Sequence, residues 1–348
     1  MNTESRFDRL RSHPDVALDI AIRPPWADFG EVPKSRSAWE AMRGRVEARW
    51  RESLGPFPDA AALEPRLLRQ EVLPDHTRIH LRFRVDGGVG PEGEPDAYLL
   101  IPRELKQPAP GLVVLHQTTD QHIDQPVGIS GREGVHIALR QVRRGYVCLV
   151  ARNFLWCRSG VPLQQITRDL LETPVPQRNG RGFRWKTGMA KMLWDAIRST
   201  DYLVSRPEVD PTRIGTIGHS LGAKEVIYHA AFDPRVKVAV SCEGGISLRF
   251  SNWNADWYLG KQIDAPGFQA DHQELLALTA PRAFLLIGGE SADGGKSWPF
   301  VRSALPIYRL YGAEERLGLL RHPAGHDFPH PGVDRELVDL WLDHSLQP

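Results

Sequence analysis

One pentapeptide constrains the fold of this chain more than any other feature. Gly218-His219-Ser220-Leu221-Gly222 has the pattern Gly-x-Ser-x-Gly, and it lies between a strand-like run at 212–217 and a helix-like run at 223–231. In that setting the pattern predicts a sharp, strained turn that exposes the serine hydroxyl. Glycines two residues before and after the serine allow the strand and the helix to approach closely. We therefore expect Ser220 to lie at the edge of a sheet as a candidate nucleophile.

The composition is that of an ordinary globular protein, and it argues against a nucleic-acid or membrane partner. A length of 348 residues with 41% hydrophobic and 25% charged residues is typical of a globular protein. The net charge of +1 gives no electrostatic case for a nucleic-acid partner. The polar N-terminus lacks the apolar core of a signal peptide, and no apolar run is long enough to span a membrane. With 3 cysteines and no Cys-x-x-Cys spacing, we expect a cytoplasmic protein.

The first 75 residues differ from the rest of the chain. The apolar residues Trp39, Met42, Val46 and Trp50 recur at helical spacing, and Pro56 ends the pattern. We predict an N-terminal helical extension over 1–75, packed on a second domain over 76–348. At the start of that domain, alternating apolar residues predict one half-exposed strand over 71–85, with residues 97–101 as its partner.

From residue 110 onward, strand-like and helix-like segments alternate. Short apolar runs at 112–115, 146–150, 214–217, 236–241 and 282–287 predict strands, and 188–204 and 334–346 predict helices. This alternation predicts an α/β fold with a doubly wound, mostly parallel sheet. Two irregular insertions, at about 152–187 and 243–279, are expected to cover the edge of the sheet where ligands bind.

A second glycine motif has a different interpretation. Residues 88–93 spell Gly-x-Gly-x-x-Gly, the pattern of dinucleotide-binding loops. A dinucleotide site requires a helix that begins at the motif, but here prolines intervene and a strand follows. We interpret the motif as a hairpin loop and expect no cofactor.

A general base and an acid are sought after the serine, because folds built around this turn carry them in the order acid, then histidine. His326 lies between a short apolar run and the last predicted helix, and it is the candidate base; His322 and His330 are alternatives. For the acid we favour Asp293, on the loop after 282–287, with Glu243 and Glu290 as alternatives. Pro323 prevents a helix that could place two of the histidines on one face, so we expect no metal.

These residues together predict acyl transfer through a covalent intermediate. His326 would take the proton of Ser220, and the acid would orient the imidazole. The backbone N–H groups of Leu221 and Gln117 are expected to form the oxyanion hole, with Thr118 as an alternative to Gln117. His116 is interpreted as a structural anchor of its loop.

The motifs also resemble a known family. Over about 75–348, the chain resembles the α/β-hydrolase superfamily, and within it the branch related to acetyl xylan esterases and dienelactone hydrolases. The residues that carry this resemblance are 116–119, the pentapeptide, 232–236 and 280–282. Lys224 and Glu243 are also similar to residues of glucuronoyl esterases. That likeness implies a lysine that contacts sugar hydroxyls and a glutamate that can serve as the triad acid.

The resemblance implies a serine hydrolase of carboxylic esters whose substrate is small or carbohydrate-linked. Trp253 and Trp257, in the second insertion, are candidate substrate contacts; the alternative is that they form the core of that insertion. Two other functions remain open: an amidase or peptidase with the same machinery, and a non-catalytic binding protein that keeps the fold.

Overall fold

The structure is a computed structural model that describes residues 7–347, apart from positions 15, 20, 21, 29, 89, 121, 330 and 331. The chain forms two compact units. Unit 1 comprises Met1–Arg51, Thr216–Asn252 and Ala265–Pro348, and unit 2 comprises Glu52–Gly215 and Trp253–Asp264. Strand β8 (Val209–His219) passes from unit 2 into unit 1. The expected boundary at residue 75 stays a prediction.

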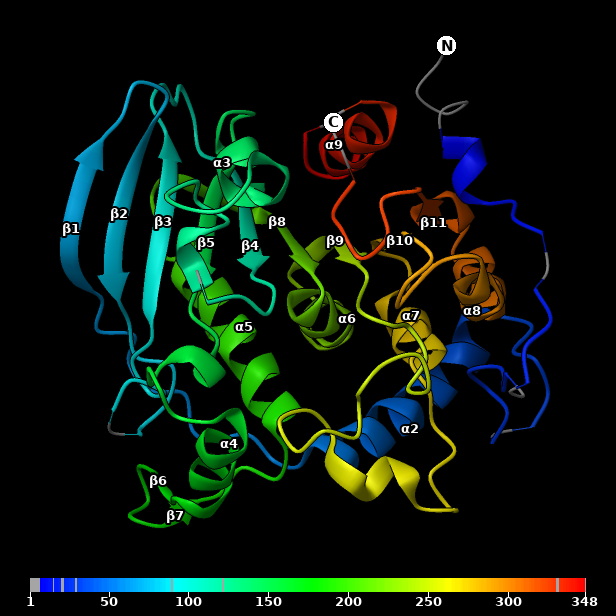
Figure 1. Ribbon diagram of the computed structural model, residues 1–348. Helices are drawn as coiled ribbons and strands as arrows, with labels where there is room; N and C mark the ends of the chain where they lie inside the picture. The colour runs from blue at the N-terminus through cyan, green and yellow to red at the C-terminus, as the bar shows by residue number, and fades with distance from the viewer. Residues whose placement is uncertain are drawn as a thin grey trace. The chain divides into compact units, whose positions relative to one another are not determined.

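Unit 2 contains a mixed sheet whose strand order is β1-β2-β3-β5-β4-β8. Strands β1, β2, β3 and β5 pair antiparallel, and β4 pairs parallel with β5. Helix α3 packs on β3 and β5, and α5 packs on β4 and β5 (Figure 1). The elements are β1 (Arg66–Val72), β2 (His76–Arg82), β3 (Asp96–Pro102), β4 (Ala109–Leu115), α3 (Ile137–Val142), β5 (Val147–Ala151), α4 (Leu163–Glu172), β6 (Val175–Pro176), β7 (Gly182–Phe183) and α5 (Gly188–Val204), with short 3₁₀ turns at His122–Asp124, Glu133–Val135, Phe154–Trp156 and Gly260–Asp264.

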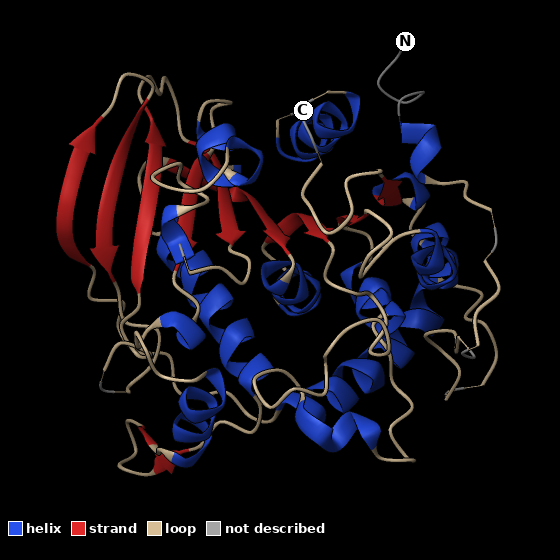
Figure 2. Cartoon of the chain, viewed as in Figure 1, coloured by secondary structure: helices blue, strands red, loops and turns tan. Residues whose placement is uncertain are grey.

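Unit 1 contains the end of β8 in the strand order β8-β9-β10-β11, within which β9, β10 and β11 pair parallel. Helices α6 and α9 both pack against β9, α6 below it and α9 above it in Figure 1. The secondary structure is coloured in Figure 2. The elements are α2 (Arg36–Leu54, whose last residues lie in unit 2), α6 (Leu221–Phe232), β9 (Val236–Cys242), α7 (Gln273–Thr279), β10 (Ala283–Gly288), α8 (Trp298–Leu310), β11 (Leu317–Arg321) and α9 (Val333–Leu346), with 3₁₀ turns at Asp8–Leu10, Gly295–Ser297 and Glu314–Arg316.

Local sequence explains these elements. Strand β4 is buried at every position, which suits its continuous apolar run. Helix α5 begins after Thr187, whose hydroxyl accepts a hydrogen bond of 3.1 Å from the backbone N–H of Ala190. The apolar face of α2 buries Trp50, which donates a hydrogen bond of 2.7 Å to Glu274. The predicted α/β fold with a mostly parallel sheet is confirmed.

Two details of the prediction are wrong. The single strand expected over 71–85 is a hairpin of β1 and β2. The hairpin turns at Pro74 and Asp75, where the backbone N–H of Leu73 donates a hydrogen bond of 2.9 Å to the carbonyl of His76. The insertions are also less irregular than expected, since the first contains α4 and the second contains α7.

Candidate active site

Ser220 lies in a tight turn between β8 and α6. Its backbone has φ 56° and ψ −112°, a strained conformation for a residue with a side chain. A Cβ atom at Gly218 would collide with the carbonyl group of Gly222, so only glycine fits there. The strain and the close approach are those that the pentapeptide predicts. Ser220 therefore presents its hydroxyl at the carboxyl end of β8, directly before the N-terminus of α6.

The imidazole of His326 contacts both the serine and a carboxylate. His326 Nε2 lies 2.9 Å from Ser220 Oγ, and Nδ1 lies 3.2 Å from Glu243 Oε2. The His326 side chain is 47% exposed, whereas that of Glu243 is fully buried. His219 supports the arrangement, because its Nε2 lies 3.1 Å from the backbone carbonyl of His326. The three side chains form one continuous chain of hydrogen-bonding contacts within unit 1.

Glu243 is held in its ionised form by the loop around it. Its Oε2 accepts a hydrogen bond of 2.6 Å from the Ala292 N–H, and its Oε1 accepts one from Gly289. Burial acts to raise the pKa of Glu243, but the hydrogen bonds from His326 and the backbone outweigh it and lower this pKa. Like Ser220, Glu243 has a positive φ, here 60°. An ionised carboxylate therefore faces the imidazole.

Asp293, the acid favoured by the sequence, has other contacts. Its carboxylate accepts hydrogen bonds of 2.7 and 2.8 Å from the backbone N–H groups of Gly245 and Ile246, and one of 2.8 Å from the Ser297 hydroxyl. The side chain is fully buried, which raises the pKa of Asp293. The structure thus brings Glu243, rather than Asp293, to His326. The Asp293 carboxylate instead binds the backbone of the loop that follows Glu243.

The remaining candidates from the sequence lie elsewhere. Glu290 forms an ion pair of 2.6 Å with Arg321. The buried His322 accepts a hydrogen bond of 3.1 Å from Ala324 N–H through its Nδ1. His330 is outside the described residues. Among the described side chains, no group of three or more His, Cys, Asp or Glu residues is arranged to hold a metal ion.

Lys224 and two residues that the sequence did not single out, His272 and Asp271, hold the loop after Glu243. Lys224 Nζ donates a hydrogen bond of 2.7 Å to the Gly244 carbonyl, and His272 Nδ1 lies 3.0 Å from the Ile246 carbonyl. Asp271 accepts a hydrogen bond of 2.9 Å from Leu248 N–H. Together with Asp293, these side chains fix the backbone of the loop. No local motif marks them, because three separate segments supply them.

Lys224 is a buried amine in α6. Its side chain lies one helical turn after Ser220. Burial lowers the pKa of Lys224 to about 7, although the negative charge of Asp293 opposes this effect. The amine therefore titrates near neutral pH while it contacts the acid-bearing loop.

Gln117, Trp253 and Trp257, also expected from the sequence as site residues, belong to unit 2, whereas Leu221 begins α6 in unit 1. Gln117 follows β4, and its carbonyl lies 2.8 Å from His116 Nδ1. His116 Nε2 accepts a hydrogen bond of 3.0 Å from Asn153 N–H, and burial lowers the pKa of His116 to about 4. A neutral imidazole therefore bridges two loops, in agreement with the anchoring role expected for it. Trp253 is fully buried and Trp257 is partly exposed. The oxyanion-hole role expected for Gln117 and the substrate contacts expected for Trp253 and Trp257 stay predictions.

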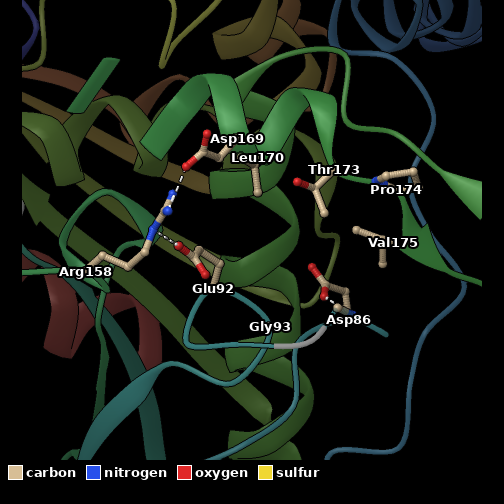
Figure 3. Close-up of a pocket in the computed structure, with 10 residues that line it drawn as sticks. Asp86, Glu92, Gly93, Arg158, Asp169, Leu170, Thr173, Pro174 and Val175 are labelled. Atoms are coloured by element: carbon tan, nitrogen blue, oxygen red, sulfur yellow. Dashed lines mark hydrogen bonds and ion pairs between the residues drawn. The ribbon is translucent and has the colours of Figure 1, made fainter. Parts of the chain in front are cut away.

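Unit 2 also contains a pocket of about 300 Å³. Figure 3 shows Arg158 between Asp169 and Glu92, with which it forms ion pairs of 2.7 Å each. Asp86, also in its lining, accepts a hydrogen bond of 2.7 Å from Gly88 N–H. Arg158 is thus paired with two carboxylates of the lining, Asp86 is paired with Lys191 outside it, and neither Ser220 nor His326 belongs to it. We assign it no part in catalysis.

No helix in the described part of the chain has an apolar stretch long enough to cross a membrane.

Comparisons with known proteins agree with the fold. Residues 96–264 match the family described as "Dienelactone hydrolase family". A "Putative hydrolase YtaP" of Bacillus subtilis (strain 168) is 24% identical over 288 residues, which cover 78% of this chain and 90% of that protein.

Solved structures of esterases share the fold. A glucuronoyl esterase from Solibacter usitatus superposes with a TM-score of 0.72 at 19% identity, over 97% of this chain and 99% of that one. An acetyl xylan esterase from Paenibacillus sp. R4 gives a TM-score of 0.53 at 16% identity, over 92% and 98% of the two chains. Residues 96–264 therefore match the dienelactone hydrolase family, in a chain whose fold resembles those of glucuronoyl and acetyl xylan esterases.

Proposed function

We propose that this protein is a serine hydrolase that cleaves carboxylic esters of a carbohydrate-linked substrate. One observation carries the proposal: His326 lies within hydrogen-bond distance of both Ser220 Oγ, at 2.9 Å, and the buried carboxylate of Glu243, at 3.2 Å. This is the arrangement that nucleophilic acyl transfer requires. The similar folds of glucuronoyl and acetyl xylan esterases support a sugar-bearing ester as the substrate class.

In the proposed mechanism, His326 Nε2 accepts the proton of Ser220 as the hydroxyl oxygen attacks the ester carbonyl. The negative charge of Glu243 stabilises the imidazolium that forms and keeps the Nδ1 proton directed toward the carboxylate. The imidazolium then gives its proton to the leaving alcohol, and an acyl-enzyme remains. Water, activated by the same imidazole, releases the acid and restores Ser220.

Glu243 replaces Asp293 as our proposed triad acid. A carboxylate with a lowered pKa that contacts Nδ1 meets the chemical requirement, whereas the carboxylate of Asp293 is engaged by two backbone N–H groups and a hydroxyl. One oxyanion donor is proposed to be the N–H of Leu221, the first residue of α6, because the N-terminus of a helix favours negative charge.

The test is ester hydrolysis by the purified protein and by the Ser220→Ala variant. We expect turnover of p-nitrophenyl acetate, of a benzyl ester of glucuronic acid or of acetylated xylan, with kcat lower on the order of 10⁶-fold in the variant. Ser303→Ala is the matched control, since this serine bonds the Phe300 carbonyl in α8 and should leave the rate unchanged. The two sugar substrates distinguish a sugar in the acyl group from a sugar in the alcohol.

A fluorophosphonate probe adds a readout that does not depend on the substrate. The wild-type protein should be labelled at Ser220, and the alanine variant should not. A folded wild-type protein that neither reacts with the probe nor cleaves any of the esters would contradict the proposal and favour a binding protein. Cleavage of amides but not of esters would instead favour the amidase function.

A further inference from the structure

The outer edge of strand β1 is open and carries exposed apolar side chains. β1 pairs with β2 alone among the described strands, and Figure 1 shows it at the end of the unit 2 sheet. Leu67 and Val72 are each 60% exposed, and Leu68 is 41% exposed. An uncovered edge strand presents unpaired backbone N–H and C=O groups, which can pair with another strand.

A β-bulge divides the side chains of β1 between two faces. Leu67 pairs with Leu81 and Arg69 pairs with His80, so Leu68 is the extra residue of the bulge. Because side chains alternate along a strand, Leu67, Gln70 and Val72 share one face. Arg69 and Glu71 share the other. Without the bulge, Leu67 and Val72 would lie on opposite faces.

This arrangement makes the edge complementary to itself. Consider two copies of β1 that lie antiparallel, with Gln70 of one copy opposite Gln70 of the other. If the bulged Leu68 of each copy stays unpaired, Val72 of one copy lies opposite Leu67 of the other. In the same register Glu71 lies opposite Arg69. The Val72–Leu67 pair is apolar, and the Glu71–Arg69 pair joins opposite charges. By symmetry each pair occurs twice in the dimer, and the two residues of a pair lie on the same face of the sheet. No like charges are opposed within this register.

We propose that two copies of this chain associate through antiparallel pairing of their β1 edges, about a two-fold axis at Gln70. The backbone is oriented for it. Leu73 N–H donates to the His76 carbonyl, toward β2, so by alternation the backbone groups of Val72 and Gln70 point to the open edge. The interface is isologous, as in most homodimers.

The pairing is a weak one. A single strand pair buries less than the roughly 1,600 Å² of a standard protein interface, so we expect a dissociation constant on the order of 0.1 mM. Arg69 and Glu71 contact each other at 2.8 Å within one strand, and the Arg69 side chain is 71% exposed. At the exposed edge, Arg69 can exchange this contact for Glu71 of a second copy, while Glu71 keeps its ion pair of 2.9 Å with Arg78 of β2.

Sedimentation velocity over a concentration series tests the dimer. Wild type should shift from monomer to dimer near the expected dissociation constant, and Val72→Lys should remain monomeric. Leu68→Lys is the matched control, because it places the same charge on the same strand but at the bulged position, and it should dimerise like wild type. Circular dichroism checks that each variant is folded.

Charge reversal gives a test that loss of folding cannot imitate. Arg69→Glu and Glu71→Arg should each be monomeric, since each opposes like charges twice. A mixture of the two variants should form a heterodimer, because both charge pairs are then complementary. The proposal is overturned if wild type stays monomeric throughout the series, if the lysine variants at 68 and 72 behave alike, or if the mixture does not associate.

Discussion

Lys224 Nζ donates a hydrogen bond of 2.7 Å to the carbonyl oxygen of Gly244, the residue that follows Glu243. This contact joins the helix that begins at the nucleophile to the loop that carries the proposed acid. The contact fixes the backbone directly after Glu243, whose φ of 60° is strained, while the N–H groups of Gly289 and Ala292 hold its carboxylate. We therefore propose a positioning role for Lys224, with its expected contact to substrate as the alternative.

The first prediction concerns the pH dependence of stability. The pKa of Lys224 is about 7 in the folded protein and about 10.4 in an unfolded chain. Between these values the unfolded state binds a proton that the folded state does not, so the free energy of unfolding rises with pH. This rise should amount to about 2–3 kcal/mol between pH 7 and pH 9 and should be absent in Lys224→Met.

Urea unfolding at a series of pH values measures the rise. Lys237→Met is the control, because Lys237 is an exposed lysine on the adjacent strand β9, and its curve should parallel that of wild type. Parallel curves for wild type and Lys224→Met would show that Lys224 keeps an ordinary pKa.

The second prediction separates the two acids. Glu243→Gln should lower kcat by roughly 10³- to 10⁴-fold, because a neutral amide cannot stabilise the imidazolium. It should also lower the melting temperature, since the amide offers one acceptor oxygen to the N–H groups of Gly289 and Ala292. Asp293→Asn should mainly lower the melting temperature, because one of the two backbone N–H groups loses its acceptor. Ester hydrolysis and calorimetry of both variants test this. A larger loss of kcat in Asp293→Asn than in Glu243→Gln would return Asp293 to the role of acid.

The choice between these acids shows where sequence reasoning reaches its limit. Glu243 and Asp293 both follow the carboxyl ends of adjacent parallel strands, so their sequence positions are equally compatible with a triad. The two acids differ in their surroundings: the backbone conformation at Glu243 and the N–H groups of the facing loop direct the Glu243 carboxylate to His326. Those are tertiary contacts, and neither spacing nor composition encodes them locally.

Elements with a strong periodic pattern were predictable. Helix α5 was expected over 188–204 and has those bounds, because apolar residues recur along its buried face. Helix α8 was not predicted from the sequence. Pro306 interrupts its helical pattern, yet the folded helix contains this proline. Helix α4 was also missed, although Leu163, Ile166 and Leu170 follow helical spacing within a segment interpreted as irregular.

The third prediction tests the turn at Ser220. Gly218→Ala should destabilise the protein by roughly 1–3 kcal/mol, because the new methyl group meets the backbone of Gly222, which cannot move without shifting α6. It should also lower kcat on the order of 10²-fold, since α6 carries the Leu221 N–H. Gly44→Ala, in the middle of α2 with open space around it, should instead stabilise by about 0.5–1 kcal/mol. Equal effects of the two substitutions on unfolding by urea would contradict this account of the turn.

The last prediction concerns a buried ion cluster in unit 2. Lys191, whose side chain is fully buried, lies 3.1 Å from Asp86 and 2.6 Å from Asp195. Burial acts to lower the pKa of Lys191, but the two carboxylates outweigh it and raise this pKa, so the amine stays charged. Lys191→Met would leave both carboxylates buried without their cation, which typically costs about 3–5 kcal/mol of stability. Lys186→Met, at an exposed lysine that bonds the Glu52 carbonyl, is the control and should change the free energy of unfolding by less than about 0.5 kcal/mol. Chemical denaturation of both variants decides the matter, and an unchanged midpoint for Lys191→Met would mean that the carboxylates are neutral in the folded protein.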